Sequence, residues 1–197
     1  IIIACNTASS VDHKVLKDIA HGIPVVNVID PVVKHVATHC QNCHIGVIGT
    51  KRTTNSKVYP KKLQLLNAKA DVTSLATPLL APMIEEGFFN DQLSQTVIDS
   101  YLSNPELKDI DKLILACTHY PLIQEEIQSY YQGKVDIIDS ASQVAEYVKQ
   151  LLKKEDLLSY ETPTHHFYVS DYTDSFEQAA KLFFHEEIHL KEVKLTP

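Results

Sequence analysis

Two cysteines in this chain follow apolar runs in similar sequence contexts. Cys5 follows Ile1–Ala4 and precedes an Asn-Thr pair, while Cys117 follows Leu113–Ala116 and precedes a Thr-His pair. A thiolate can act as a base, and a thiol can donate a proton. Two thiols on opposite sides of one carbon atom could therefore remove a proton from one face and return a proton to the other.

The expected positions of these cysteines favour a shared site. Ligands of open parallel sheets bind at the carboxyl ends of the strands, where both thiols would lie. A helix that begins just after each thiol would favour its thiolate form. The neighbours that could hold a carboxylate through hydroxyl, amide or imidazole groups are Asn6, Thr7, Thr118 and His119. Either cysteine by itself would be interpreted as a buried core residue, but the matched pair favours a site.

Three further residues bear on the same site. His119 follows Cys117 closely in the turn after a strand, which favours an acid–base role or control of the thiol. Thr50 ends the apolar run 45–49, and its hydroxyl could either contact a ligand or cap the next turn. Glu85, on the residues alone, is interpreted as a solvated surface charge.

Strand-like apolar runs alternate with amphipathic helix-like segments along the chain. This alternation predicts an α/β fold with largely parallel sheets flanked by helices. The predicted strands are Ile1–Ala4, Pro24–Ile29, Ile45–Gly49, Val72–Leu75, Lys112–Ala116, Val135–Ile138 and Phe167–Val169. The predicted helices are Ser10–Ala20, Val32–Thr38, Asn55–Leu66, Leu80–Gly87, Asp91–Leu102, Pro121–Tyr131, Ser142–Lys154 and Ser175–His185.

The composition excludes several classes of protein. The 197 residues are 44% hydrophobic and 22% charged, which is typical of a folded globular chain. The net charge of -7 argues against nucleic-acid binding, which depends on Lys and Arg. No apolar run approaches the roughly 18–20 residues that span a bilayer, so we expect no membrane association. The cysteine spacing does not predict a disulfide framework, and a reducing cytoplasmic setting is expected.

The beginning of the chain is unusual. It opens on three isoleucines, with neither a Met nor a basic leader segment. An apolar strand with nothing before it is typical of the middle of a protein. We therefore expect the sequence to be a fragment whose N-terminal part is missing.

At these residues the chain resembles the cofactor-independent aspartate/glutamate racemase family. The resemblance rests first on Ala4-Cys5-Asn6-Thr7-Ala8-Ser9 and on Ala116-Cys117-Thr118-His119-Tyr120-Pro121-Leu122. Supporting matches are Ile23–Val26, Val28–Pro31, Gly49–Lys51 with Thr53, Pro82–Gly87 and Ile138–Ser140, in the expected order over essentially the whole chain. The aspartate-directed relatives usually carry an acidic residue where His119 stands.

The resemblance implies a two-base isomerase that interconverts L- and D-glutamate without PLP, metal or other cofactor. Cys5 and Cys117 would be the proton-transferring pair, assisted by His119 and by Glu85 near the second thiol. The residues implied to bind the substrate are Asn6, Thr7, Thr50, Thr53, Thr118 and His119. The implied product D-glutamate would serve peptidoglycan and cell-wall synthesis, and a homodimer is possible.

The resemblance also implies two similar α/β domains that face each other. Residues 1–30 with 142–197 would form an incomplete first domain, and residues 31–141 a second domain. The family's early Asp-Ser-Gly motif and its later Tyr-Gly pair have no match here. Because the Asp is thought to assist the first thiol, we expect little or no racemase activity from this chain alone.

The sequence leaves other functions open. The chain could racemise another acidic amino acid such as aspartate, or could be a non-catalytic α/β binding module. A thiol-dependent hydrolase is disfavoured, because a Cys and a His so close in sequence usually cannot form the nucleophile–base hydrogen bond.

Two histidine-containing segments could suggest a metal or haem. The segment 39–44, His-Cys-Gln-Asn-Cys-His, contains the C-x-x-C-H pattern of haem attachment and zinc-type ligands. We disfavour both uses, because the segment precedes a predicted strand and so lies away from the ligand-binding edge. His165-His166 is expected in a loop, with metal binding again disfavoured.

Overall fold

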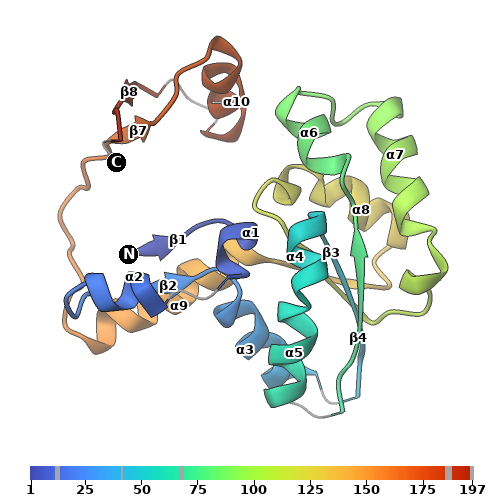
Figure 1. Ribbon diagram of the computed structural model, residues 1–197. Coiled ribbons are helices and arrows are strands. Elements are labelled where there is room, and N and C mark those ends of the chain that lie inside the picture. Colours follow the sequence, from blue (N-terminus) through green and yellow to red (C-terminus); the bar gives the residue numbers. More distant parts are fainter. Residues whose placement is uncertain (12–13, 41, 67–68, 185–187, 196–197) are drawn as a thin grey trace.

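A four-stranded parallel sheet in the order β4-β3-β5-β6 lies at the centre of the fold. The protein is described here by a computed structural model, which covers residues 1–11, 14–40, 42–66, 69–184 and 188–195 (Figure 1). The strands of the sheet are β3 (His44–Gly49), β4 (Asp71–Ala76), β5 (Lys112–Ala116) and β6 (Asp136–Asp139). The predicted α/β class with parallel strands is confirmed.

Helices cover both faces of this sheet because its central strands are apolar on both faces. Leu113 and Leu115 of β5 pack in a cluster with residues of α6, α7 and α8, whereas Ile114 and Ala116 pack with residues of α3 and α5. Successive side chains of a strand point to opposite faces, so β5 contributes side chains to the core on each face of the sheet. The helices are α3 (Asp30–His39), α5 (Val58–Leu66), α6 (Leu80–Glu85), α7 (Gln92–Leu102) and α8 (Gln124–Tyr131).

Two short parallel strand pairs lie outside the central sheet. β1 (Ile2–Ile3) pairs with β2 (Val26–Asn27), and β7 (Phe167–Val169) pairs with β8 (Leu190–Glu192). The remaining helices of these end segments are α1 (Asn6–Ser9), α2 (Lys14–Ile19), α9 (Ser140–Lys154) and α10 (Asp174–Phe184). In Figure 1 the chain leaves α9 and arches back, so that β7, β8 and α10 lie above the N-terminal segment.

Several predicted helices divide at specific residues. The predicted helix 10–20 is replaced by α1 and α2, with residues 12–13 outside the described part. The predicted helix 55–66 begins earlier, as α4 (Lys51–Ser56), because the Thr50 side chain accepts a hydrogen bond from the Thr53 N–H and caps it. Lys57 has φ of 55°, a left-handed conformation that ends α4 before α5 begins.

The segment after β5 also differs from the prediction. The predicted helix 121–131 is a short 3₁₀ helix, η2 (Tyr120–Ile123), followed by α8. A second 3₁₀ helix, η1 (Pro105–Leu107), and strand β8 were not predicted. Short elements of three or four residues have too few side chains to produce a periodic pattern.

All four central strands come from residues 44–139, within the range predicted for the second domain. The predicted domain boundaries themselves stay a prediction, since α9 begins directly after β6 and packs against α3. Within the described residues, the helices are all too short or too polar to cross a membrane.

Candidate active site

The carboxyl ends of β3 and β5 bring two predicted site residues to one edge of the sheet. Gly49 pairs with Ala116, and the next residues in the chain are Thr50 and Cys117. A Cβ added at Gly49 would lie 2.9 Å from the Ala116 carbonyl oxygen. The absence of a side chain at Gly49 therefore permits the close strand approach from which both residues emerge.

The Cys117 thiol is buried, with 6% of the residue exposed. Burial raises its pKa to about 11, and the negative charges of Cys5 and Glu85 act in the same direction. The backbone N–H groups of His119 and Tyr120 partly oppose this rise in pKa by hydrogen bonding to the sulfur. Cys117 therefore holds its proton at neutral pH, in the form that can donate it.

His119 connects the Cys117 thiol to Glu85. Its Nδ1 lies 3.5 Å from Cys117 Sγ, and its Nε2 lies 3.0 Å from Glu85 Oε1. A Cys and a His so close in sequence usually do not form a hydrogen bond of this kind, but this pair does. The chain turns immediately into η2, with a hydrogen bond from the Tyr120 N–H to the Cys117 carbonyl, and this turn brings the two side chains together.

Cys5 stands at the N-terminus of α1, one residue beyond Ala4, which follows β1. Ser9 fixes this segment, because its Oγ donates to the Ile3 carbonyl and accepts from the Val28 N–H. Cys5 is exposed, and its charge contributes to the raised pKa of Cys117. The two thiols are therefore within electrostatic reach of each other, although they are 112 positions apart in the sequence.

Three threonine hydroxyls form a cluster beside Cys5. Thr7 Oγ1 lies 2.9 Å from Thr50 Oγ1 and 3.4 Å from Thr53 Oγ1, and the latter two are 3.1 Å apart. Thr50 caps α4, which is one of the two roles left open by the sequence, and its hydroxyl also joins this cluster. Its contact with a ligand stays a prediction. The cluster links α1 to the carboxyl end of β3.

The Asn6 side chain is buried and only half satisfied. Its Oδ1 accepts a 2.7 Å hydrogen bond from the Tyr59 hydroxyl, while its Nδ2 has no partner among the described residues. A buried amide donor without a partner is costly, and such groups commonly mark a place for a ligand or water.

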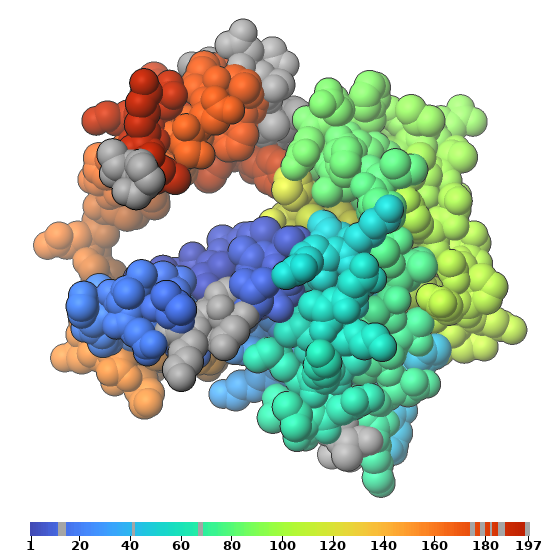
Figure 2. All heavy atoms as spheres, viewed as in Figure 1, coloured from blue at the N-terminus to red at the C-terminus, as the bar shows by residue number. Residues whose placement is uncertain are grey.

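A cavity of about 1270 Å³ opens between His119 and the C-terminal segment. Ala4, Glu85 and His119 line one side, and aromatic residues such as Phe176 and Phe183 line the other. Figure 2 shows this hollow between the C-terminal segment, coloured orange to red, and the N-terminal segment, coloured blue. The ring of Phe183 approaches His119 edge-on, with 5.7 Å between the ring centroids.

The structure adds residues that the sequence analysis did not single out. Thr118 is half-buried beside Cys117, and its expected contact with substrate stays a prediction; Tyr59 and Thr77 were missed. The Thr77 hydroxyl lies 2.7 Å from that of Tyr120. Thr77 directly follows β4, in the position that Thr50 holds after β3, and this placement is the signal that could have identified it. Tyr59 lies within a helix, where no comparable signal exists.

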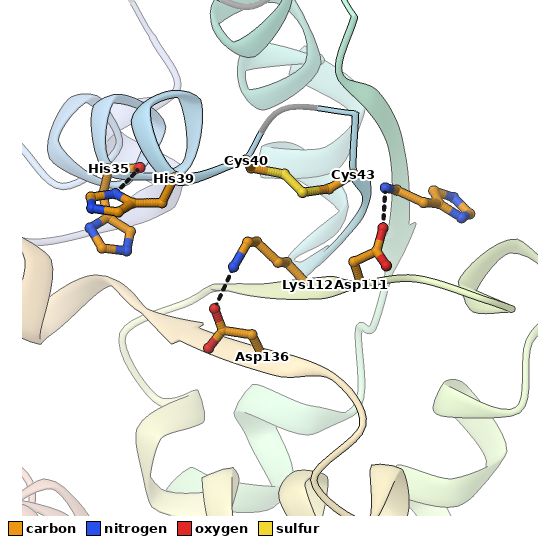
Figure 3. Close-up of a disulfide and its surroundings, with 8 residues drawn as sticks. His35, His39, Cys40, Cys43, Asp111, Lys112 and Asp136 are labelled. Atoms are coloured by element: carbon orange, nitrogen blue, oxygen red, sulfur yellow. Dashed lines mark hydrogen bonds and ion pairs between the residues drawn. A yellow bond between two sulfur atoms is a disulfide. The ribbon is translucent and has the colours of Figure 1, made fainter.

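Cys40 and Cys43 are joined by a disulfide, although the sequence predicted no disulfide (Figure 3). Their Cα atoms are 5.7 Å apart, and only the four residues 40–43 connect the end of α3 to the start of β3. The pair lies near Asp111 and Asp136, at the amino ends of the strands as expected. In the described part of the chain, no three His, Cys, Asp or Glu side chains are grouped to hold a metal. Residue 41 is outside the described residues.

Comparison with known proteins gives consistent results. Residues 1–148 match the Asp/Glu/Hydantoin racemase family. A glutamate racemase from Aquifex aeolicus is 38% identical over 191 residues, which cover 97% of this chain and 71% of that protein. A glutamate racemase from Chlorobium phaeobacteroides is 37% identical over 190 residues, covering 95% and 70% respectively. The crystal structure of Francisella tularensis glutamate racemase in complex with D-glutamate superimposes with a TM-score of 0.89 at 36% identity, covering 98% of this chain and 73% of that chain.

Proposed function

Since the chain belongs to the Asp/Glu/Hydantoin racemase family, we propose that it interconverts L- and D-glutamate by transferring the α-proton between two thiols. One observation carries the proposal. Cys5, at the end of β1, and Cys117, at the end of β5, are brought within electrostatic reach beside a cluster of hydrogen-bonding side chains.

In the proposed reaction, the thiolate of one cysteine removes the α-proton and leaves a carbanion at the α-carbon. The thiol of the other cysteine then donates its proton to the opposite face, which inverts the configuration. The enzyme ends with its proton on the other sulfur, so the next turnover can run in reverse. This scheme uses no metal and no organic cofactor.

His119 and Glu85 support the cycle at Cys117. When Cys117 must act as a base, His119 Nδ1 is placed to accept its proton at 3.5 Å. Glu85, at 3.0 Å from His119 Nε2, stabilises the resulting imidazolium. This assistance compensates for the burial that raises the thiol pKa.

The substrate carboxylates are bound, in this proposal, by donors near Cys5. The unpartnered Asn6 amide and the hydroxyls of Thr7, Thr50 and Thr53 supply neutral hydrogen bonds. Thr118, beside the second thiol, contacts the substrate from the Cys117 side. The product D-glutamate would serve peptidoglycan synthesis, and a cytoplasmic homodimer stays a prediction.

The test measures α-proton exchange in deuterated water, using the 197-residue chain, from which little or no exchange is expected, and any longer form that its gene encodes. The proposal expects solvent deuterium in the α-position with inversion, starting from either L- or D-glutamate. Binding of glutamate without exchange would instead indicate a binding module. Faster exchange of aspartate would indicate the aspartate-type activity, and an acyl-enzyme on either cysteine would indicate a hydrolase.

Substituting each thiol separately examines the two-base scheme. Cys5→Ala and Cys117→Ala should both abolish racemisation. Each should still allow exchange of the α-proton in the one enantiomer that faces the remaining thiol. Exchange of both enantiomers by a single-cysteine variant would refute the two-base assignment.

A further inference from the structure

Tyr59 links the apolar core to the candidate site through a single hydroxyl. The residue lies in α5 and is 1% exposed, packed in a cluster with Ile29, Val32 and Leu63. Its hydroxyl leaves this cluster and donates to Asn6 Oδ1, across 53 residues of sequence. Asn6 is itself only 2% exposed.

The chemistry of this contact determines which end of the Asn6 amide is free. Burial raises the pKa of Tyr59 well above its ordinary value, so the hydroxyl keeps its proton throughout the physiological range. The Tyr59 hydroxyl donates this proton to Oδ1, so the free end of the Asn6 amide is Nδ2. This nitrogen is buried and has no partner among the described residues. An amide donor left in this state favours an occupant that carries an acceptor.

We infer that Tyr59 is a positioning residue that fixes the Asn6 amide so that Nδ2 donates to a carboxylate oxygen of the substrate. The inference rests on the proposed function, because it assigns one contact within that site. Tyr59 acts through Asn6 and does not itself touch the substrate. Its position in the rigid core gives the amide one orientation before the substrate arrives, which reduces the entropy lost on binding.

The inference is tested with Tyr59→Phe, which removes the hydroxyl and keeps the ring. In the longest active form of the chain, the KM for both glutamate enantiomers should rise about tenfold, as expected for one misplaced hydrogen bond to a charged group. The value of kcat should change by less than about threefold, because proton transfer does not involve Asn6. In an Asn6→Ala background the same substitution should change KM by less than about twofold.

Two matched variants separate positioning from a structural role. Tyr131→Phe removes another buried hydroxyl, one that has no hydrogen-bond partner in the described part of the chain, and should leave KM unchanged. Asn6→Asp keeps an acceptor for Tyr59 but removes the donor, so KM should rise at least as much as in Tyr59→Phe. This second variant answers the question even if Tyr59→Phe does not fold.

The possible results are distinguishable. Active parent enzyme with an unchanged KM in Tyr59→Phe or Asn6→Asp would overturn this inference and leave the proposed function intact. The inference would also be overturned if Tyr59→Phe raised KM by the same factor in the Asn6→Ala background as in the parent. The hydroxyl would then act on a group other than Asn6. A parent protein that neither binds nor exchanges glutamate would overturn the proposed function and this inference together.

Discussion

His119 Nδ1 lies 3.5 Å from Cys117 Sγ, although a single residue separates the two in the sequence. The contact depends on the chain entering a 3₁₀ helix directly after the thiol. Glu85 completes the arrangement from α6, an element that follows a different strand. The thiol, the imidazole and the carboxylate thus form a continuous path from a buried proton to a partly exposed charge.

Replacing His119 by Asn should lower kcat/KM by about 100-fold, within the range that acid–base assistance contributes. The loss should be equal in both directions, because the two enantiomers have equal free energies in water and the equilibrium constant is one. Glu85→Gln should lower kcat/KM less, by about tenfold, because Glu85 acts only through His119. Initial rates from L- and D-glutamate measure both effects.

His39→Asn is the matched control for this prediction. His39 lies at the end of α3, near the amino ends of the strands, and its Nδ1 contacts the His35 carbonyl. Its substitution should leave kcat/KM within about twofold of the parent. Unchanged activity in His119→Asn would contradict the assistance proposed for Cys117.

The buried thiol of Cys117 should make stability fall at alkaline pH. Its pKa is raised from an ordinary 9.0 to about 11 in the folded state. The folded chain therefore keeps a proton that the unfolded chain loses as the pH rises above 9.0. The stabilisation is complete below that pH and should decrease by about 3 kcal/mol as the pH approaches 11.

Denaturant unfolding at a series of pH values measures this effect. The comparison is with Cys117→Ala, in which the contribution of the thiol is absent. The slope of the free energy of unfolding against pH is compared between the two proteins, and the difference gives the contribution of Cys117. Parallel curves between pH 9 and 11 would show that the thiol pKa is not raised.

Thr50→Ala should lose both stability and substrate affinity. Loss of the cap on α4 costs about 1 kcal/mol, and loss of the hydroxyl cluster should raise KM several-fold. Thr50→Ser should keep most of the stability and most of the substrate affinity. Asp91→Ala, which removes the cap of α7, should lower the melting temperature similarly without changing KM. Equal KM in Thr50→Ala and the parent would exclude the cluster from substrate binding.

The Cys40–Cys43 disulfide should not contribute to catalysis, because it lies near the amino ends of the strands while Cys5 and Cys117 follow their carboxyl ends. A double Cys40→Ser, Cys43→Ser variant should keep kcat/KM within about twofold. Activity that depends on the state of this disulfide would contradict the prediction.

Alkylation of the native, unreduced protein should label Cys5, which is exposed, well before Cys117.

Glu126 should matter for stability because it joins α8 to the start of α7. Its Oε1 accepts from the Ser94 hydroxyl at 2.6 Å and from the Asn90 N–H at 3.1 Å, in a buried position. Glu126→Ala should cost about 1–3 kcal/mol, since it leaves both donors without this acceptor. Glu125→Ala, at the exposed neighbouring position, should be nearly neutral. Thermal unfolding of the two variants provides the comparison.

Periodicity identified the longer elements and the fold class. The runs around β3, β4 and β5 alternate with amphipathic helices, and this pattern is sufficient for an α/β prediction. The short elements α1, α4, η1 and η2 were not predicted separately, because the ends of such elements depend on single residues. The helix α4, for example, begins at the cap of Thr50 and ends at the left-handed Lys57. Such boundaries are set by local hydrogen bonds and are weakly encoded in hydrophobic pattern.

The sequence by itself identified the family of this protein, from two thiols after apolar strands with hydroxyl, amide and imidazole neighbours. Only the tertiary structure decided how those groups are arranged. It placed His119 against Cys117, brought Thr7 onto Thr50 and Thr53, and connected Tyr59 to Asn6. The reason is physical: residue types set the reactions that are possible, whereas pKa values and hydrogen-bond partners depend on burial and on contacts between distant segments.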